Sequence, residues 1–294
     1  MPDFALFIQT FAPYRGPMLR AALLMFIAMS LVPIGDSAGK LLGTEHGVNP
    51  FFIAWSRFGL GTLMVLTFLP RRHLDPRLFL DWRIWLRGLL ISCGISSILT
   101  ALQTEPLPNV FGAFFIGPIL SYFLSAWLLK ERITRLQTML LLLGFGGVLL
   151  VVKPGFGMTA GIGFAALAGV FYGCFLTTNR WLADAVPPRA LLFSHLVLGT
   201  VFLTLPGAAH IPTFTTAITG LTVISAFASM AGNGLLIVAY RMAPASTMAP
   251  FVYFQLFAAT LLGWAIFNDL PDALTVCGLV VVVLSGIGSS VLKR

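Results

Sequence analysis

The chain has 294 residues, of which 58% are hydrophobic and 10% are charged, and its mean hydropathy is +0.94. Soluble domains carry about 25% charged residues, so this composition excludes a protein that is solvated mainly by water. The formal net charge of +8 does not indicate nucleic-acid binding, because the Lys and Arg residues fall in short segments between apolar runs.

Apolar runs long enough to cross a hydrocarbon core of about 30 Å recur along the whole chain. The charged residues, Pro and Gly between these runs predict ten transmembrane helices. Their expected ranges are 19–39, 49–69, 86–104, 108–129, 136–152, 160–180, 190–206, 217–238, 245–267 and 273–291. The segment 1–18 shows no pattern of a cleaved signal peptide and is expected in the cytoplasm. The longest interval, Pro70 to Trp85, is basic and is expected to lie along the membrane surface.

The distribution of Lys and Arg predicts the orientation of the chain. With the N-terminus inside, fifteen of these residues, Arg87 among them, fall on the cytoplasmic side. Only Lys40 and Lys153 fall outside, and Arg57 lies within the second span. Because cytoplasmic loops of membrane proteins are enriched in positive charge, both termini are predicted to be cytoplasmic.

An internal repeat divides the chain into two halves. Residues 101–115 align with residues 239–253, with Ala101 on Ala239 and Pro106 on Pro244. Five spans per copy is an odd number, so the second copy enters the membrane from the opposite side. Inverted repeats of this kind occur in many secondary transporters, whose solute site lies between the halves. The sequence thus predicts an all-α integral membrane protein with ten transmembrane helices in two inverted five-helix repeats, 19–155 and 156–294.

A family resemblance is carried by residues 107–155, with the sequence LPNVFGAFFIGPILSYFLSAWLLKERITRLQTMLLLLGFGGVLLVVKPG. This stretch has Pro118 in mid-helix, Glu131 at a helix end and then a Gly-rich helix, and it resembles the end of an EamA domain of the drug/metabolite transporter superfamily. The second copy, 243–292, resembles the same pattern more loosely. There Asp269 stands in place of the glutamate, and no proline matches Pro118.

The resemblance covers nearly the whole chain and implies a ten-helix, two-repeat carrier in the inner membrane of a bacterium. It does not imply one substrate. Members of the family are similar to exporters of amino acids and to importers of vitamins such as riboflavin.

Four ionisable residues, Asp36, Lys40, Arg57 and Glu105, map to the predicted outer half of the bundle. A charge at the centre of a membrane costs from about 2.5 kcal/mol upward, so such residues usually face a partner or a cavity. Asp36 and Lys40 are four residues apart and can pair on one helix face. The four residues can form an outer gate. Alternatively, Lys40 and Glu105 reach the interface, and Asp36 with Arg57 is a fixed structural pair; a proton site at Asp36 also stays open.

Polar and aromatic residues in the second half are candidates for solute binding. They are Tyr172, Asn179, Asn233, Phe251, Tyr253 and Gln255. Helical spacing places Tyr172 and Asn179 on one face, with Phe175 between them. An aromatic lining with a few amides and hydroxyls suits a flat, neutral or zwitterionic solute. The alternatives are ordinary packing of the many Phe residues and interhelical hydrogen bonds from the amides.

Secondary transport is therefore the favoured function, with uptake of a riboflavin-like vitamin as the first specific expectation and export of amino acids or related metabolites as the alternative. A membrane-embedded enzyme is disfavoured, because the four histidines are scattered and no catalytic motif is present. No catalytic residue, metal or cofactor is predicted. The expected partners are a small-molecule solute and the lipid bilayer, without nucleic acid, and a homodimer is left open.

Overall fold

The computed structural model describes residues 17–68, 76–152, 159–267 and 270–291. Within these ranges the chain forms helices and no strand, which confirms the all-helical prediction for this part of the protein. Eight helical segments are long and apolar enough to cross a membrane by length and composition. Two further apolar helices are shorter, Arg135–Val151 and Ala273–Gly288.

The helices follow each other with short connections. The first half contains α2 (Pro17–Thr44), α3 (Pro50–Phe68), the short 3-10 helix η2 (Pro76–Leu80), α4 (Trp82–Thr104), α5 (Leu107–Phe114), α6 (Ile116–Leu128) and α7 (Arg135–Val152). The second half contains α8 (Ala160–Leu182), α9 (Pro188–Ala208), α10 (Thr216–Met242), α11 (Ala245–Val252), α12 (Phe254–Phe267) and α13 (Ala273–Val291).

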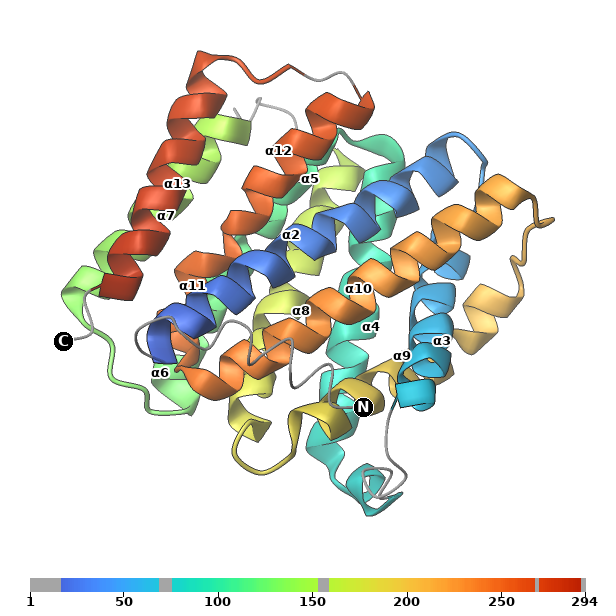
Figure 1. The fold of residues 1–294 in the computed structure, drawn as a ribbon, viewed down its shortest axis with the longest axis horizontal. Coiled ribbons are helices and arrows are strands. Elements are labelled where there is room, and N and C mark those ends of the chain that lie inside the picture. Colours follow the sequence, from blue (N-terminus) through green and yellow to red (C-terminus); the bar gives the residue numbers. More distant parts are fainter. Residues whose placement is uncertain (1–16, 69–75, 153–158, 268–269, 292–294) are drawn as a thin grey trace.

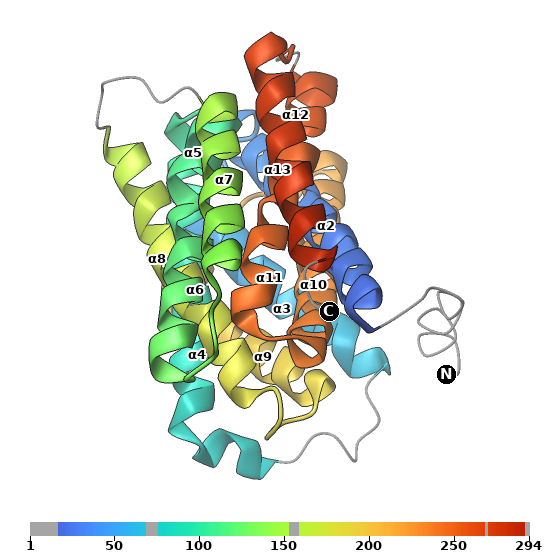
Figure 2. The ribbon, with the colours of Figure 1, turned by 90° about the vertical axis from the view of Figure 1, so that its left-hand side faces the viewer.

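Helices from the two halves pack against each other throughout the bundle. The closest pairs are α2 with α10, α4 with α8, α3 with α9 and α7 with α13. The α3 and α9 pair lies at one side of the bundle and the α7 and α13 pair at the opposite side (Figures 1 and 2). The remaining helices lie between them, so the centre of the molecule is built from both halves of the chain.

Two of the predicted continuous spans, 108–129 and 245–267, are each interrupted at one residue. The first helix breaks at Phe115, between α5 and α6, and the second at Tyr253, between α11 and α12. Pro118 contributes to the first break, because its ring lacks an N–H donor and crowds the carbonyl four residues earlier. Pro250 lies in the last turn of α11, before the second break, and its missing N–H concerns the carbonyl of Ser246 and not the break at Tyr253. Residues 109–128 and 245–267 still each form one segment long enough to cross a membrane, as predicted, but the one-residue interruptions were not foreseen.

Glycines allow α6 and α8 to cross closely beside the first break. A Cβ atom on Gly117 would lie 2.6 Å from the carbonyl oxygen of Gly169, and one on Gly173 would lie 2.5 Å from that of Gly117. Backbone atoms cannot move aside as a side chain can, so these positions require glycine. The α5 to α6 break is thereby fixed against the middle of α8.

The interval predicted to lie on the membrane surface is described only in part. Residues 76–85 contain η2 and the start of α4, and their Leu80 and Trp82 side chains are 84% and 64% exposed. Residues 69–75, nearly all of the segment 1–18, Lys153 and Asp269 lie outside the described residues. The surface location of this interval stays a prediction.

Candidate functional site

The two helix breaks meet in the centre of the bundle through aromatic rings. The rings of Phe115 and Tyr253, the two break residues, contact edge to face with 5.4 Å between their centres. Beside them, Phe114 lies 4.9 Å from the ring of Tyr172 in the middle of α8. Phe175, one turn further along α8, stacks on Tyr172 at 6.0 Å. The breaks and α8 thus form a continuous row of aromatic side chains.

Several buried polar atoms have no hydrogen-bond partner among the described residues. At or beside the breaks these are the hydroxyls of Tyr172 and Tyr253 and both polar atoms of the Gln255 amide; elsewhere they are the hydroxyls of Ser37, Ser96 and Tyr240, Trp55 Nε1 and Asn179 Nδ2. Gln255 is 0% exposed. A buried polar group without a partner costs about 1–3 kcal/mol, so native proteins retain few of them. Tyr172, Tyr253 and Gln255 lie near the middle of membrane-length spans, so they are the candidates for hydrogen bonds to a ligand at the breaks.

A charged cluster joins α2, α3 and α10. Arg57 donates from Nη1 to the Asp36 carboxylate at 2.7 Å, from Nη2 to the Gly35 carbonyl at 2.6 Å, and from Nε to the Ser225 hydroxyl at 2.7 Å. Ser225 in turn donates to the Gly35 carbonyl at 2.9 Å. Arg57 and Asp36 are only 3% and 2% exposed. We refer to these residues as the Arg57 cluster, in which the buried cation has its counter-charge within the protein.

A second cluster joins α4, α8 and α9. Arg87 donates to the Asn179 side-chain oxygen at 2.6 Å and to the Leu191 carbonyl at 2.9 Å, and its Nη2 lies 3.5 Å from His195 Nδ1. Its guanidinium also lies over the Phe175 ring, 4.9 Å from the ring centre. Arg87 is fully buried, and none of the described residues adds a carboxylate to this Arg87 cluster.

The two clusters occupy corresponding places in the two halves of the chain. The alignment that sets Ala101 on Ala239 also relates Arg57 of α3 to His195 of α9. It relates Arg87 of α4 to Ser225 of α10 in the same way. At these two pairs of positions each cluster therefore has an arginine from the first half of the chain and a neutral side chain from the second half, with the arginine and the neutral residue exchanged between the two clusters.

Lys40 and Glu105 lie near the Arg57 end of the bundle. Lys40 Nζ donates to the backbone carbonyl of Glu105 at 2.9 Å, and the Glu105 carboxylate accepts a hydrogen bond from Thr159. Asp36 pairs with Arg57, which is the structural pair that the sequence left open beside a pairing of Asp36 with Lys40. The contact of Lys40 with Glu105 links α2 to the end of α4.

Glu131 lies at the Arg87 end of the bundle, after α6. Its carboxylate accepts hydrogen bonds from the backbone N–H groups of Ala245 and Ser246, at 3.1 and 2.9 Å, at the start of α11. Arg180 of α8 lies 3.5 Å from the same carboxylate. The glutamate on which the family resemblance rests therefore anchors a helix N-terminus, where negative charge is favourable.

Asn233 of α10 and Phe251 of α11 are buried, and their contacts lie within their own helix or with a neighbouring ring. The Asn233 amide donates to the carbonyl of Ser229 on its own helix at 2.9 Å. Phe251 packs through its ring in α11, with the ring centre 5.5 Å from that of Phe254. The expected continuous stripe through Phe251 and Gln255 is interrupted by the break at Tyr253.

Sequence reasoning missed Arg87 and His195. Arg87 was counted among the cytoplasmic cations, because the predicted span began at residue 86, but α4 begins at Trp82 and buries the arginine. His195 was dismissed as one of four scattered histidines, although it lies in an apolar run. The signal that could have identified both is an ionisable residue within a membrane-length helix, which usually has a functional partner.

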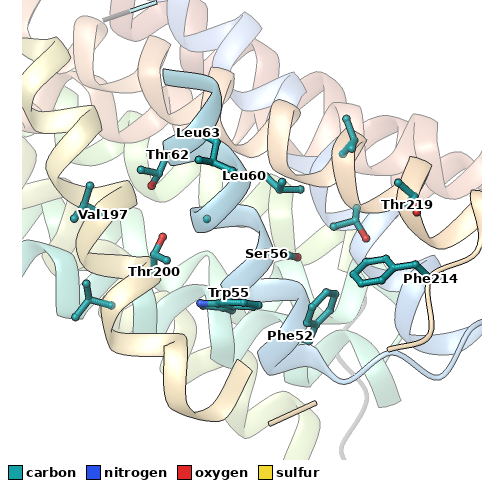
Figure 3. Close-up of a pocket in the computed structure, with 14 residues that line it drawn as sticks. Phe52, Trp55, Ser56, Leu60, Thr62, Leu63, Val197, Thr200, Phe214 and Thr219 are labelled. Atoms are coloured by element: carbon teal, nitrogen blue, oxygen red, sulfur yellow. The ribbon is translucent and has the colours of Figure 1, made fainter. Parts of the chain in front are cut away.

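An apolar crevice lies at the side of the bundle between α3, α9 and α10 (Figure 3). It has a volume of about 570 Å³ and is lined by side chains such as Phe52, Trp55 and Phe214. The hydroxyls of Ser56, Thr62, Thr200 and Thr222 in its wall donate to carbonyls of their own helices, whereas the Trp55 indole N–H has no partner among the described residues. The lining is otherwise mostly apolar, and the crevice is separate from the row of rings at the breaks, so we do not assign it as the solute site.

Known proteins resemble this chain along most of its length. It is 25% identical over 257 residues to an S-adenosylmethionine uptake transporter of Rickettsia bellii, covering 84% of this chain and 85% of the relative. It is 25% identical over 281 residues to a riboflavin transporter of Vibrio cholerae, covering 91% of each. It is 26% identical over 249 residues to a pseudopaline exporter of Pseudomonas aeruginosa, covering 82% and 86%.

A solved crystal structure shares the fold, with a TM-score of 0.74 over 93% of this chain and 97% of that chain at 18% sequence identity. The model of the EamA-like transporter family matches twice, at residues 19–153 and 159–291. These matches include both helix breaks and both arginine clusters. The chain therefore belongs to the EamA-like transporter family.

Proposed function

We propose that this protein is a secondary transporter that imports a flat heteroaromatic metabolite, neutral or zwitterionic, across the inner membrane of a bacterium. In this proposal ten helices cross the membrane as two inverted five-helix repeats, with both termini in the cytoplasm. The double family match supports the repeat, as do the two breaks, Phe115 and Tyr253, which the alignment of the halves sets on each other. The excess of Lys and Arg on one side supports the orientation.

The central site is the feature that carries the proposal. Transporters with broken helices commonly bind their solute at the breaks, near the middle of the membrane. Here Phe115 and Tyr253 would stack on a flat ring, and Tyr172, Tyr253 and Gln255 would supply hydrogen bonds to its polar edge. Riboflavin and the adenine group of S-adenosylmethionine are both flat nitrogen heterocycles, so either kind of solute suits this lining.

The two arginine clusters would close the site at its two ends. The Arg57 cluster holds α2, α3 and α10 together, and the Arg87 cluster holds α4, α8 and α9 together. In the predicted orientation the first lies toward the outside and the second toward the cytoplasm. Alternating access would then require each cluster to separate in turn while the other stays closed.

The direct test is transport by bacterial cells with and without the expressed protein. Cells would receive labelled riboflavin, labelled S-adenosylmethionine or labelled amino acids, and uptake would be followed over the first minutes. Accumulation of one flat heterocycle, lost in the Gln255→Leu variant, supports the proposal. Accumulation that Gln255→Leu leaves unchanged would reject the central site, and accumulation of none of these solutes would reject the proposed substrate class.

Export is the second candidate function. The relative named as a pseudopaline exporter is 26% identical to this chain, about the same identity as the 25% of the S-adenosylmethionine uptake transporter. Right-side-out and inside-out vesicles with the same imposed gradient separate the two directions. Accumulation only in inside-out vesicles would assign export of an amino-acid-related metabolite and exclude the uptake proposal.

A further inference from the structure

Arg87 is a buried cation that has no carboxylate partner among the described residues. The side chain is 0% exposed and lies within a candidate membrane span. Its hydrogen-bond contacts, Asn179, Leu191 and His195, are a side-chain amide, a backbone carbonyl and an imidazole. Among the described residues no carboxylate pairs with this guanidinium. A buried cation without a counter-charge is costly, and in membrane proteins such groups are usually functional.

In the Arg57 cluster the buried arginine has a counter-charge within the protein. Arg57 and Arg87 lie in corresponding clusters, but only Arg57 has a carboxylate within the described part of the chain, that of Asp36 at 2.7 Å. In the Arg87 cluster the first helix of the second half, α8, contributes Asn179, a neutral side chain of nearly the same shape as aspartate, although the alignment of the halves sets Asp36 on Cys174. Within the described residues, one of the two arginine clusters therefore contains a carboxylate and the other does not.

Asn179 provides a second, independent indication of a ligand. Its side-chain oxygen accepts from Arg87, but its Nδ2 donor is buried and has no partner among the described residues. The residue is 1% exposed. The cluster therefore lacks one negative charge and one hydrogen-bond acceptor. A carboxylate supplies both, because it can accept from a guanidinium and from an amide N–H at once.

We propose that Arg87 and Asn179 bind the carboxylate of the transported solute when this end of the bundle opens. The row of rings supports this assignment, because Phe175 stacks on Tyr172 near the breaks and lies under the Arg87 guanidinium. The inference rests on the proposed transport function and narrows the solute to an amino-acid-type zwitterion. A neutral vitamin without an acidic group does not meet the needs of this cluster.

Arg83 offers a matched comparison one helical turn earlier on α4. Its guanidinium also lies over an aromatic ring of α8, 5.3 Å from the centre of Trp181. Arg83, however, is partly exposed and pairs with Asp81 at 2.6 Å. It therefore has the same type of ring contact as Arg87 but needs no further anion.

The experiment measures thermal unfolding of the purified protein in lipid nanodiscs, with sodium benzoate as the probe and benzamide as its uncharged counterpart. Benzoate should raise the unfolding midpoint of the wild-type protein by a few degrees, and benzamide at the same concentration should not. Arg87→Gln should abolish the response, whereas Arg83→Gln should keep it. Asn179→Asp should raise the midpoint without ligand and also abolish the response, because it supplies the missing charge internally.

Three results would overturn the proposal. Equal shifts with benzoate and benzamide would show that the carboxylate is not recognised. A benzoate response retained in Asn179→Asp or Arg87→Gln would place the anion elsewhere. An equal shift with sodium chloride would assign the cluster to an inorganic anion and not to the solute. Because the readout needs no transported solute, failure of the uptake assay alone leaves this test valid, and the two failures are distinguishable.

Discussion

The Arg57 and Arg87 clusters differ in one respect that separates structural from functional polar groups. Around Arg57 the guanidinium, the carboxylate and the hydroxyl all have partners within the protein. Around Arg87, within the described residues, the cation has no carboxylate and an amide donor has no partner. The same contrast separates the Arg57 cluster from the helix breaks, where tyrosine hydroxyls and a glutamine amide have no partner in the described part of the chain.

This comparison indicates which buried polar groups are available to a solute. Groups whose hydrogen bonds are complete hold helices together and gain nothing from a ligand. Groups with unused donors, acceptors or charge carry a cost that a ligand can remove. By this criterion we propose that Gln255, Tyr253, Tyr172, Asn179 and Arg87 contact the solute, and that Asp36 and Arg57 hold the bundle closed.

The largest expected effect comes from neutralising each arginine in turn. Arg57→Gln leaves the Asp36 carboxylate buried without its partner and should destabilise the protein by about 3–5 kcal/mol. Arg87→Gln leaves no carboxylate of the described residues unpaired, so it should change the free energy of unfolding by less than about 1 kcal/mol. Denaturation in detergent measures both. Equal losses in the two variants would contradict the distinction between the clusters.

A smaller effect is expected from Gly39→Ala, which tests how tightly the Arg57 cluster is built. The added methyl would lie 2.5 Å from Arg57 Nη2 and 2.9 Å from Leu99 Cδ2. Because three hydrogen bonds hold that guanidinium, the substitution should cost about 1–3 kcal/mol. Gly163→Ala is the control, since nothing lies within 4 Å of its added methyl, and it should be neutral or stabilising. Similar unfolding midpoints for the two variants would show that the cluster can adjust.

Two tyrosines allow the comparison to be sharpened by removing one oxygen atom. The Tyr122 hydroxyl is bonded to Thr138 at 2.7 Å, so Tyr122→Phe should lower stability by about 0.5–1.5 kcal/mol and keep transport. The Tyr253 hydroxyl has no partner among the described residues, so Tyr253→Phe should keep stability and weaken transport. Parallel measurements of unfolding and solute uptake check both. The reverse pattern would mean that unpartnered groups do not mark the solute site.

The smallest effect is expected for Glu131→Gln. The neutral amide keeps only one of the two acceptor oxygens for the N–H groups at the start of α11, and it loses the charge that favours a helix N-terminus and faces Arg180. Stability should fall by about 0.3–1 kcal/mol, less at high salt. Unfolding at two salt concentrations measures this. A loss of stability as large as that of Arg57→Gln would mean that Glu131 belongs to a buried ion pair like that of Asp36 and Arg57.

Much of the helical architecture could be predicted because membrane helices are long, apolar and bounded by charges. The repeat was also visible, and the alignment that sets Ala101 on Ala239 also sets Phe115 on Tyr253, the two break residues. The breaks themselves could not be predicted from Pro118, because prolines are also tolerated within unbroken helices, as Pro33 is in α2.

The candidate site was harder to predict, because it depends on which groups meet across the halves. Sequence spacing suggested that Asp36 could pair with Lys40, but packing brings Arg57 to it from another helix. Arg87 was hidden by its position close to a basic loop, and its partner Asn179 lies 92 residues away. Unused hydrogen-bond capacity is a property of the packed structure and has no signature in a single sequence.

The central claim is that the solute binds at the two helix breaks. The most direct measurement is the KM for the transported solute in proteoliposomes, for the wild type, Gln255→Leu and the Gly163→Ala control. The account predicts that Gln255→Leu raises KM by about tenfold or more with an unchanged unfolding midpoint, because the solute loses its hydrogen bonds to the amide. Gly163→Ala should keep the wild-type KM. An unchanged KM in Gln255→Leu, with the protein folded, would contradict the account.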